Sequence, residues 1–268
     1  MLTTIGEVLM LTLWCVVAPT LIVPIGAMVS DRSRIASAVL PFPLSLTVVF
    51  AFLLFSHLAV DLRRPDVNPY AFFLLLITLC LICATGAKWG ADRIAQSIDG
   101  LLRPIVTAIG KATGLFVLAM ALIQFTVVVL RYVFGWNSIL LQESVTYLHG
   151  GTFLLAAGYA LLTNDHVRVD IFYGSASPRR RAIIDLFGCY VFLFPFCLLT
   201  IAMSAPYVAN SWAALEGSTE QSGIQAVFLL KSLIPAFAVL LLAAGFIIAT
   251  DAARTIRDTK PAPKEATA

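Results

Sequence analysis

Ile139-Leu140-Leu141-Gln142-Glu143 precedes an apolar run from Ser144 to Thr163, and Asp165-His166-Val167-Arg168-Val169-Asp170-Ile171-Phe172-Tyr173 follows it. The apolar run is long enough to cross a bilayer as a helix, which takes about 20 residues. A carboxylate stands at one end of this helix and a mixed-charge cluster at the other, which is unusual for a bare membrane anchor. We therefore expect the other helices to pack around this one or to lead into it.

The composition is that of a polytopic membrane protein. Of the 268 residues, 60% are hydrophobic and only 12% are charged, whereas a soluble domain carries about 25% charged residues. The net charge of +3 is small, and the basic residues are spread over several loops, so nucleic-acid binding is not indicated. Because an open sheet cannot satisfy its backbone in lipid, we predict an all-α membrane helix bundle.

Seven apolar segments are long enough to span about 30 Å of hydrocarbon as helices. They cover residues 8–29, 36–60, 70–86, 114–134, 144–163, 182–206 and 225–250. The Lys and Arg residues of the loops predict the orientation. Of the 18 Lys and Arg residues of the chain, 14 lie in the odd-numbered loops and the tail, 3 lie in the even-numbered loops, and Lys231 lies in the last segment. The C-terminus is therefore predicted to face the cytoplasm and the N-terminus the periplasm.

Residues 91–113 have the pattern of an amphipathic helix. One side carries Ile94, Ile98, Leu101, Leu102, Ile105 and Ile109, and the other carries Arg93, Asp99, Arg103, Thr107 and Lys111. Such a helix lies in the membrane interface and does not cross the bilayer. Two roles are open for it: a passive anchor, or a collar that fixes the tilt of a larger membrane assembly.

The middles of all seven segments lack Asp, Glu, Lys and Arg. An ion or proton pathway usually needs ionisable groups or broken helices inside the membrane, so this chain is a poor candidate for the translocating unit. Three charges lie at outer helix ends: Arg131, Glu143 and Lys231. We expect Glu143 to pair with Arg131, with Lys231 or with a basic group of a partner subunit. Alternatively, Lys231 reaches the lipid headgroups.

The cytoplasmic turn after the central segment mixes acidic and basic side chains. It contains Asp165, His166, Arg168 and Asp170, for which capping of the turn and ion pairing are the expected roles. Three arginines precede the next segment, where they would meet anionic lipid headgroups: Arg179, Arg180 and Arg181. The outer loop 210–223 carries Glu216 and Glu220 and no basic residue.

The sequence shows no nucleophile–base pair, phosphate-binding loop or zinc-type spacing, so we predict neither an enzyme nor a metal or cofactor site. The pair Cys80 and Cys83 lacks matching ligands and is expected to pack as small hydrophobes. His57 and His149 could in principle hold a haem, although hydrogen-bonded packing is the simpler interpretation. These two histidines leave open that the chain is a membrane anchor or cytochrome-like subunit of a redox complex. A further alternative is a self-sufficient carrier.

The second half, roughly residues 100–256, resembles the small membrane subunit of tripartite ATP-independent periplasmic (TRAP) transporters, the DctQ-like family. Six motifs carry the resemblance: Arg131-Tyr132-Val133-Phe134, Leu141-Gln142-Glu143, Gly158-Tyr159-Ala160-Leu161, the Asp165 to Tyr173 stretch, Ser177-Pro178-Arg179-Arg180-Arg181 and Leu229-Leu230-Lys231-Ser232-Leu233-Ile234-Pro235. Many members have a Trp and two acidic residues where this chain has Leu140-Leu141-Gln142-Glu143. The Gln-Glu form and the Leu-Leu-Lys run are most similar to the mannitol/chloroaromatic-compound branch.

The resemblance implies a small permease subunit of the bacterial inner membrane. Residues 91–257 would form a four-helix scaffold with the interfacial helix 91–113. The resemblance does not cover residues 1–90, which the apolar segments predict to be an N-terminal membrane extension of about three helices. Residues 258–268 are rich in Pro, Ala and Lys and are expected to form a disordered tail. The partners implied are membrane lipids, a large elevator-type TRAP membrane subunit that carries the substrate and sodium sites, and an extracytoplasmic solute-binding protein that delivers an organic acid. The small subunit itself would hold no substrate site.

Overall fold

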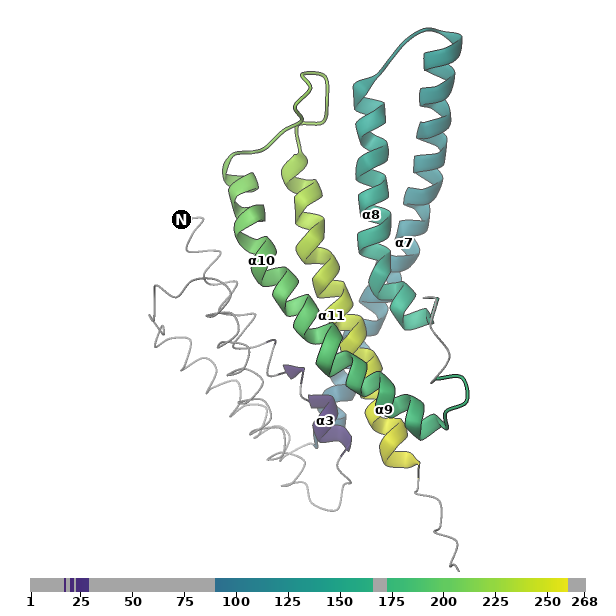
Figure 1. The fold of residues 1–268 in the computed structure, drawn as a ribbon, viewed down its shortest axis with the longest axis vertical. Helices are drawn as coiled ribbons and strands as arrows, with labels where there is room; N and C mark the ends of the chain where they lie inside the picture. The colour runs from purple at the N-terminus through teal and green to yellow at the C-terminus, as the bar shows by residue number, and fades with distance from the viewer. Residues whose placement is uncertain (1–16, 18–19, 22, 29–89, 166–172, 260–268) are drawn as a thin grey trace, which may run out of the picture. The chain divides into compact units, whose positions relative to one another are not determined.

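The computed structural model describes residues 17, 20–21, 23–28, 90–165 and 173–259, and every regular element within them is helical (Figure 1). In chain order the elements are α3 (Val23–Met28), α7 (Ala91–Val133), α8 (Ile139–Thr163), α9 (Pro178–Gly188), the π-helical turn η2 (Cys189–Leu193), α10 (Phe194–Ala213) and α11 (Val227–Asp258). No strand occurs in this part of the chain, which confirms the all-α prediction for it.

Four helical stretches among the described residues are long and apolar enough to cross a membrane. They are Ala91–Val133, Ile139–Thr163, Pro178–Ala213 and Val227–Asp258, and each contains all or nearly all of one of the last four predicted segments. The predicted segments 36–60 and 70–86 lie outside the described residues. Of the segment 8–29, only α3 and a few neighbouring residues are described. The first three of the seven predicted spans therefore stay a prediction.

One continuous helix, α7, occupies the place of the predicted interfacial helix 91–113 and of the fourth span, and the interfacial location of residues 91–113 stays a prediction. The 43 residues of α7 correspond to about 64 Å at 1.5 Å per residue, roughly twice the hydrocarbon thickness. At the expected boundary the Thr113 hydroxyl donates to the Gly110 carbonyl at 2.6 Å, as it does inside a helix. Pro104 also lies within α7. The sequence pattern changes from amphipathic to apolar near residue 113, but the helix does not end there.

The ends of α8 are set by local capping. Ser138 has an extended backbone, and its hydroxyl accepts a hydrogen bond from the Leu141 N–H, as an N-cap does. At the other end Asn164 adopts the left-handed conformation (φ 59°), and its N–H donates to the Ala160 carbonyl, as at many helix C-termini. The central helix predicted from residue 144 therefore begins five residues earlier, and Glu143 lies in its second turn.

One compact unit contains the described residues of the ranges 101–167 and 193–245. In it, α8 packs against α7 through Gly151, which faces Phe116, and Gly110, which faces Tyr159. α8 also meets α11, where a Cβ added at Gly158 would lie 2.8 Å from the Leu240 carbonyl oxygen. Small residues thus let these helices approach closely, which is common in membrane proteins.

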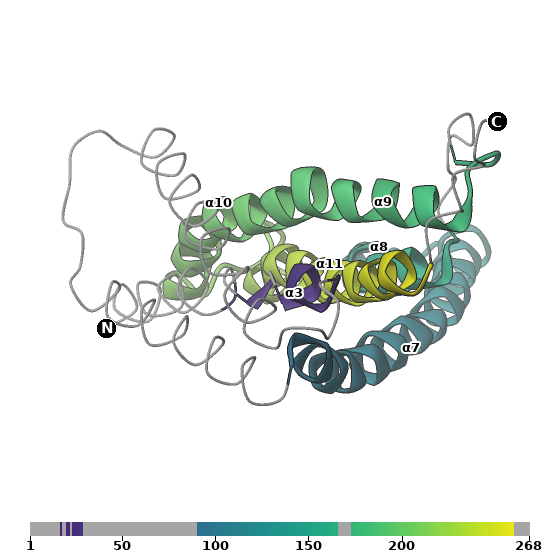
Figure 2. The ribbon, with the colours of Figure 1, turned by 90° about the horizontal axis from the view of Figure 1, so that it is seen from below.

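The second compact unit contains the described residues of the ranges 11–100, 168–192 and 246–268. Its apolar core is formed by Ala182 of α9 together with Ala252 and Ile256 of α11, and Met28 of α3 packs against them. Figure 2 shows α3 beside α11. The hydroxyl of Tyr190 donates to the Leu21 carbonyl at 2.5 Å. These contacts connect the region around α3 to the C-terminal part of the chain.

Candidate functional site at the helix ends

The Glu143 carboxylate of α8 holds the loop between α10 and α11. One oxygen accepts a hydrogen bond from the Ser218 hydroxyl, and the other accepts one from the Ile224 N–H at 2.6 Å. A Cβ added at Gly223 would lie 2.6 Å from both carboxylate oxygens. The loop backbone therefore folds tightly over Glu143, and glycine at position 223 leaves the room for this approach.

Lys231 of α11 forms an ion pair with Glu216 of the same loop. The Lys231 Nζ lies 2.5 Å from the Glu216 Oε2 and 4.1 Å from the centre of the Tyr207 ring. The same oxygen accepts a hydrogen bond from the Ser211 hydroxyl at 2.6 Å. Hydrogen bonding to Lys231, and then to Ser211, lowers the pKa of Glu216 below its ordinary value. The ammonium is thus held between a carboxylate and an aromatic face.

Lys231 does not pair with Glu143, and Arg131 makes no ion pair within the part of the chain that the structure describes. Arg131 is exposed near the end of α7. The pairing of Glu143 with a basic group of a partner subunit stays a prediction. From the sequence, Glu216 is only an acidic residue of a loop without basic ones. The unmatched acidic charge of that loop, close in sequence to the single lysine of α11, was the signal that could have identified the pair.

The turn after α8 is described only in part. Asp165 accepts a hydrogen bond from the Thr163 hydroxyl, while His166, Arg168 and Asp170 lie outside the described residues. Their predicted roles in this turn therefore stay predictions.

Arg181 closes the loop that leads into α9. It donates to the Gly174 carbonyl at 2.7 Å and to the Ala176 carbonyl at 3.0 Å, and its guanidinium lies over the Tyr173 ring. Arg180 is exposed and Arg179 is half-buried. Contact of these three arginines with lipid headgroups stays a prediction, but Arg181 also has a structural role that the sequence did not reveal.

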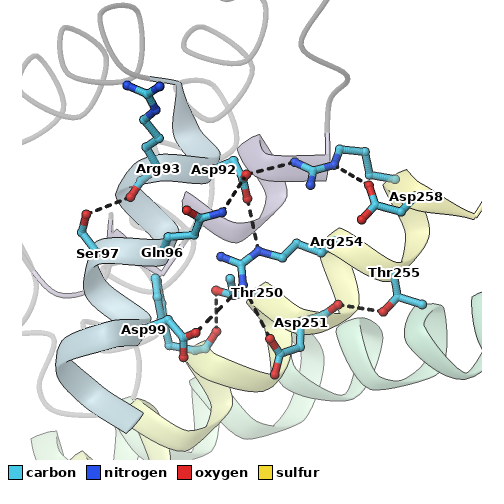
Figure 3. Close-up of polar contacts among 12 residues, drawn as sticks. Asp92, Arg93, Gln96, Ser97, Asp99, Thr250, Asp251, Arg254, Thr255 and Asp258 are labelled. Atoms are coloured by element: carbon cyan, nitrogen blue, oxygen red, sulfur yellow. Dashed lines mark hydrogen bonds and ion pairs between the residues drawn. The ribbon is translucent and has the colours of Figure 1, made fainter. Parts of the chain in front are cut away.

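A second charged cluster joins the beginning of α7 to the end of α11 (Figure 3). Arg254 points between three carboxylates, at 3.2 Å from Asp92, 3.8 Å from Asp251 and 4.0 Å from Asp99. Arg257 lies 3.3 Å from Asp92. The sequence placed Asp99 on the polar face of an interfacial helix, and the structure places this carboxylate beside Arg254 of α11. Asp92 and the two arginines had not been predicted as a site.

Two groups of charged residues, one around Glu143 and Lys231 and the other around Arg254, connect separate segments of the chain. Their cations occupy the positions beside the carboxylates, and no group of three or more His, Cys, Asp or Glu side chains suited to a metal ion occurs within the described residues. His149 is exposed on α8, with its ring 4.6 Å from that of Phe153. Its proposed haem partner, His57, lies outside the described residues. The described charges thus join helix ends to one another and to the loop between α10 and α11.

A comparison with protein families supports an interpretation as a membrane transport component. A family model described as "Tripartite ATP-independent periplasmic transporters, DctQ component" matches residues 120–258, just over half of the chain. The match begins within α7 and ends with the last residue of α11. The comparisons with curated proteins and with solved structures give no match.

Proposed function

The chain belongs to the DctQ family of TRAP transporter components, and on that premise we propose that this small subunit is a scaffold for the large, elevator-type membrane subunit. The complex would take up an organic acid that a periplasmic solute-binding protein delivers, and a sodium gradient would drive the uptake. The chain would lie in the bacterial inner membrane, surrounded by lipid. Membership of a transporter family, and not of an enzyme family, supports the expectation that it has no catalytic site. The mannitol/chloroaromatic branch stays a prediction.

The location of the charges is the observation that carries this proposal. In the four described spans the charged side chains lie toward the helix ends, and the residues between them are uncharged: 112–130, 144–163, 186–213 and 232–250. A substrate or ion pathway through these helices would ordinarily need polar groups at mid-membrane depth. Transport would therefore occur in the large subunit, against which this chain is immobile.

The contacts at the helix ends fit such a role. Glu143 and Lys231 hold the outer loop through Ile224 and Glu216, and Arg254 joins α11 to the beginning of α7 through Asp92. Ion pairs and charge-assisted hydrogen bonds of this kind restrict the relative movement of the segments they join. A rigid small subunit would enlarge the fixed surface past which the moving part of the large subunit slides.

Reconstitution of transport tests the proposal. The chain, the large membrane subunit encoded beside it and the associated binding protein are purified and combined in vesicles with a sodium gradient. We expect uptake of an organic acid only when all three proteins are present, and none with this chain alone. Uptake by the chain alone would overturn the scaffold role. A haem absorption band in the purified chain would instead favour the redox-complex hypothesis.

Substitution of Glu143 tests whether the outer loop is needed for this role. Glu143→Gln weakens the acceptor for the Ser218 hydroxyl and the Ile224 N–H, so we expect less co-purification with the large subunit and less uptake. Glu220→Gln is the matched control, because Glu220 lies in the same loop, is exposed, and makes its recorded hydrogen bonds through its backbone. Unchanged assembly and uptake with Glu143→Gln would show that Glu143 has no part in the scaffold.

A further inference from the structure

One face of α8 carries a regular row of side chains that the rest of the described chain leaves uncovered or only partly covered. The row is spaced alternately by three and four residues: Thr146, His149, Phe153, Ala156 and Ala160. This spacing places the residues along one side of a helix and is the pattern of a helix–helix seam. Thr146, His149 and Phe153 are exposed, and Phe153 is 65% exposed. We call these five residues the α8 seam.

The α8 seam carries polar groups within the span. His149 lies six residues after Glu143, about 9 Å along the helix and thus inside about 30 Å of hydrocarbon, although not at its centre. Its ring nitrogens make no hydrogen bond within the part of the chain that the structure describes. An imidazole in contact with lipid tails at this depth would lack a partner, which is costly.

A second helix of the same unit shows what a lipid-facing row looks like. The outward side of α7 carries Leu115, Leu118, Leu122 and Phe125, all more than half exposed and all purely hydrocarbon. The exposed Gln124 lies about a third of a turn away from this row. The row on α7 is thus suited to lipid tails, whereas the α8 seam combines an imidazole, a hydroxyl and small residues.

The hydropathy and burial of α8 also indicate that this helix is not surrounded by lipid alone. Of the four spanning stretches, α8 has the lowest mean hydropathy, yet only 11% of its span is buried inside the chain, compared with 56% for α11. A helix that is less apolar and is little buried by its own chain is more stable in contact with another protein than in contact with lipid tails, because its polar side chains can then find hydrogen-bonding partners. Helix interfaces inside membranes are rich in small residues and in side chains that form hydrogen bonds between helices.

We propose that the α8 seam is the surface on which a transmembrane helix of the large membrane subunit packs, with a hydrogen-bonding group level with His149. The inference rests on the proposed function, because it takes the large subunit as the partner, and it deepens that function by assigning the contact surface. The small residues Ala156 and Ala160 admit the partner helix closely, Phe153 supplies apolar contact area, and His149 fixes the register. The α7 row then faces lipid.

Photo-crosslinking in the assembled complex tests the surface. A photoreactive phenylalanine is placed at Phe153 on the seam, and at Leu118 or Leu122 on α7 as matched controls. We expect a covalent adduct with the large subunit from position 153 and none from positions 118 and 122. Adducts only from the α7 positions, an adduct between two copies of this chain, or no adduct from position 153 in an intact complex would each overturn the seam. Failure of the chain to co-purify with the large subunit would instead overturn the proposed function.

Substitution of His149 tests the hydrogen bond. Membrane hydrogen bonds are worth on average about 0.6 kcal/mol, or about threefold in an equilibrium constant, so His149→Leu should weaken association with the large subunit by about that factor. His149→Gln should restore it, because the amide keeps a donor and an acceptor. Gln124→Leu removes an exposed amide away from the seam and should change nothing. Equal association for the His149→Leu and wild-type chains would overturn the assignment of a hydrogen-bonding partner.

Discussion

At the scale of single residues, one carboxylate oxygen of Glu216 serves two donors. It accepts hydrogen bonds from the Lys231 ammonium and the Ser211 hydroxyl, and both favour the ionised form. The lowered pKa of Glu216 means that the folded chain holds the carboxylate ionised more strongly than the unfolded chain does. The stabilisation is therefore complete above the ordinary pKa of 4.5 and is lost as the pH falls through the lowered value.

We predict that this pair gives the chain an acid-sensitive component of stability. The midpoint of thermal unfolding in detergent should fall as the pH drops below about 4.5, and Glu216→Gln should make this fall shallower because the titrating group is gone. Glu220→Gln, in the same loop, should keep the wild-type slope. An equal slope for wild type and Glu216→Gln would show that the pair does not contribute.

At the scale of elements, close approach between helices depends on where glycine occurs. Gly158 is buried at the contact of α8 with α11, and the group that an added Cβ would meet is backbone, which cannot rotate away. Gly114 in α7 has no atom within 4 Å of the position that a Cβ would take. Two helical glycines thus have different roles although the sequence does not distinguish them.

We predict that Gly158→Ala separates α8 from α11 and destabilises the chain. Forcing a methyl group into a packed contact costs about 1–3 kcal/mol, so the thermal midpoint should fall. Gly114→Ala should leave the midpoint unchanged or raise it, since alanine is favoured over glycine by up to about 1 kcal/mol within a helix. The measurement is thermal unfolding of the purified variants, and equal midpoints would contradict the packing described for Gly158.

The cluster around Arg254 connects the ends of two helices that lie far apart in the sequence. We predict that Arg254→Met destabilises the connection between α7 and α11 by about 2 kcal/mol, the scale of hydrogen bonds to charged groups, because three carboxylates lose a cation that they share. Arg93→Met is the control, since Arg93 is exposed and makes no ion pair among the described residues. Thermal unfolding measures the stability of both variants.

A double variant tests the coupling between Asp99 and Arg254. Adding Asp99→Asn to Arg254→Met should recover part of the lost stability, and no recovery would show that Asp99 is not coupled to Arg254.

At the scale of the whole molecule, the predicted orientation follows from the distribution of Lys and Arg over the loops. We predict that a fluorescent reporter fused after Ala268 is active and that alkaline phosphatase fused at the same position is inactive, because the C-terminus faces the cytoplasm. Fusions in the loop 214–226 should give the opposite result. An active phosphatase after Ala268 would reverse the orientation of the second half of the chain.

Several features of the chain were predictable from the sequence, for identifiable reasons. The last four spans were found because uninterrupted apolar runs are needed to cross hydrocarbon, and the family was recognised from motifs such as the Asp165 to Tyr173 stretch and the Leu229 to Pro235 run. The continuity of α7 was missed because its two halves differ in hydrophobic pattern. A hydrophobic pattern reflects the surroundings of a helix, whereas the helix itself continues wherever the backbone keeps its helical conformation, as it does here through Pro104.

The sequence by itself determined that this is an α-helical membrane chain of the DctQ family with its charges at the helix ends, because hydropathy and loop charge act locally along the chain. Only the tertiary structure decided which charges meet. Glu143 binds Ser218 and Ile224, more than 70 residues away, and Arg254 binds Asp92 across 162 residues. Such pairs depend on how closely two helices approach and at what register. Side-chain packing around residues such as Gly158 sets this distance and register, and a local sequence pattern contains no information on either. Glu143 lies near the beginning of the central helix, as predicted, but its carboxylate binds a loop and not a lysine within the described chain.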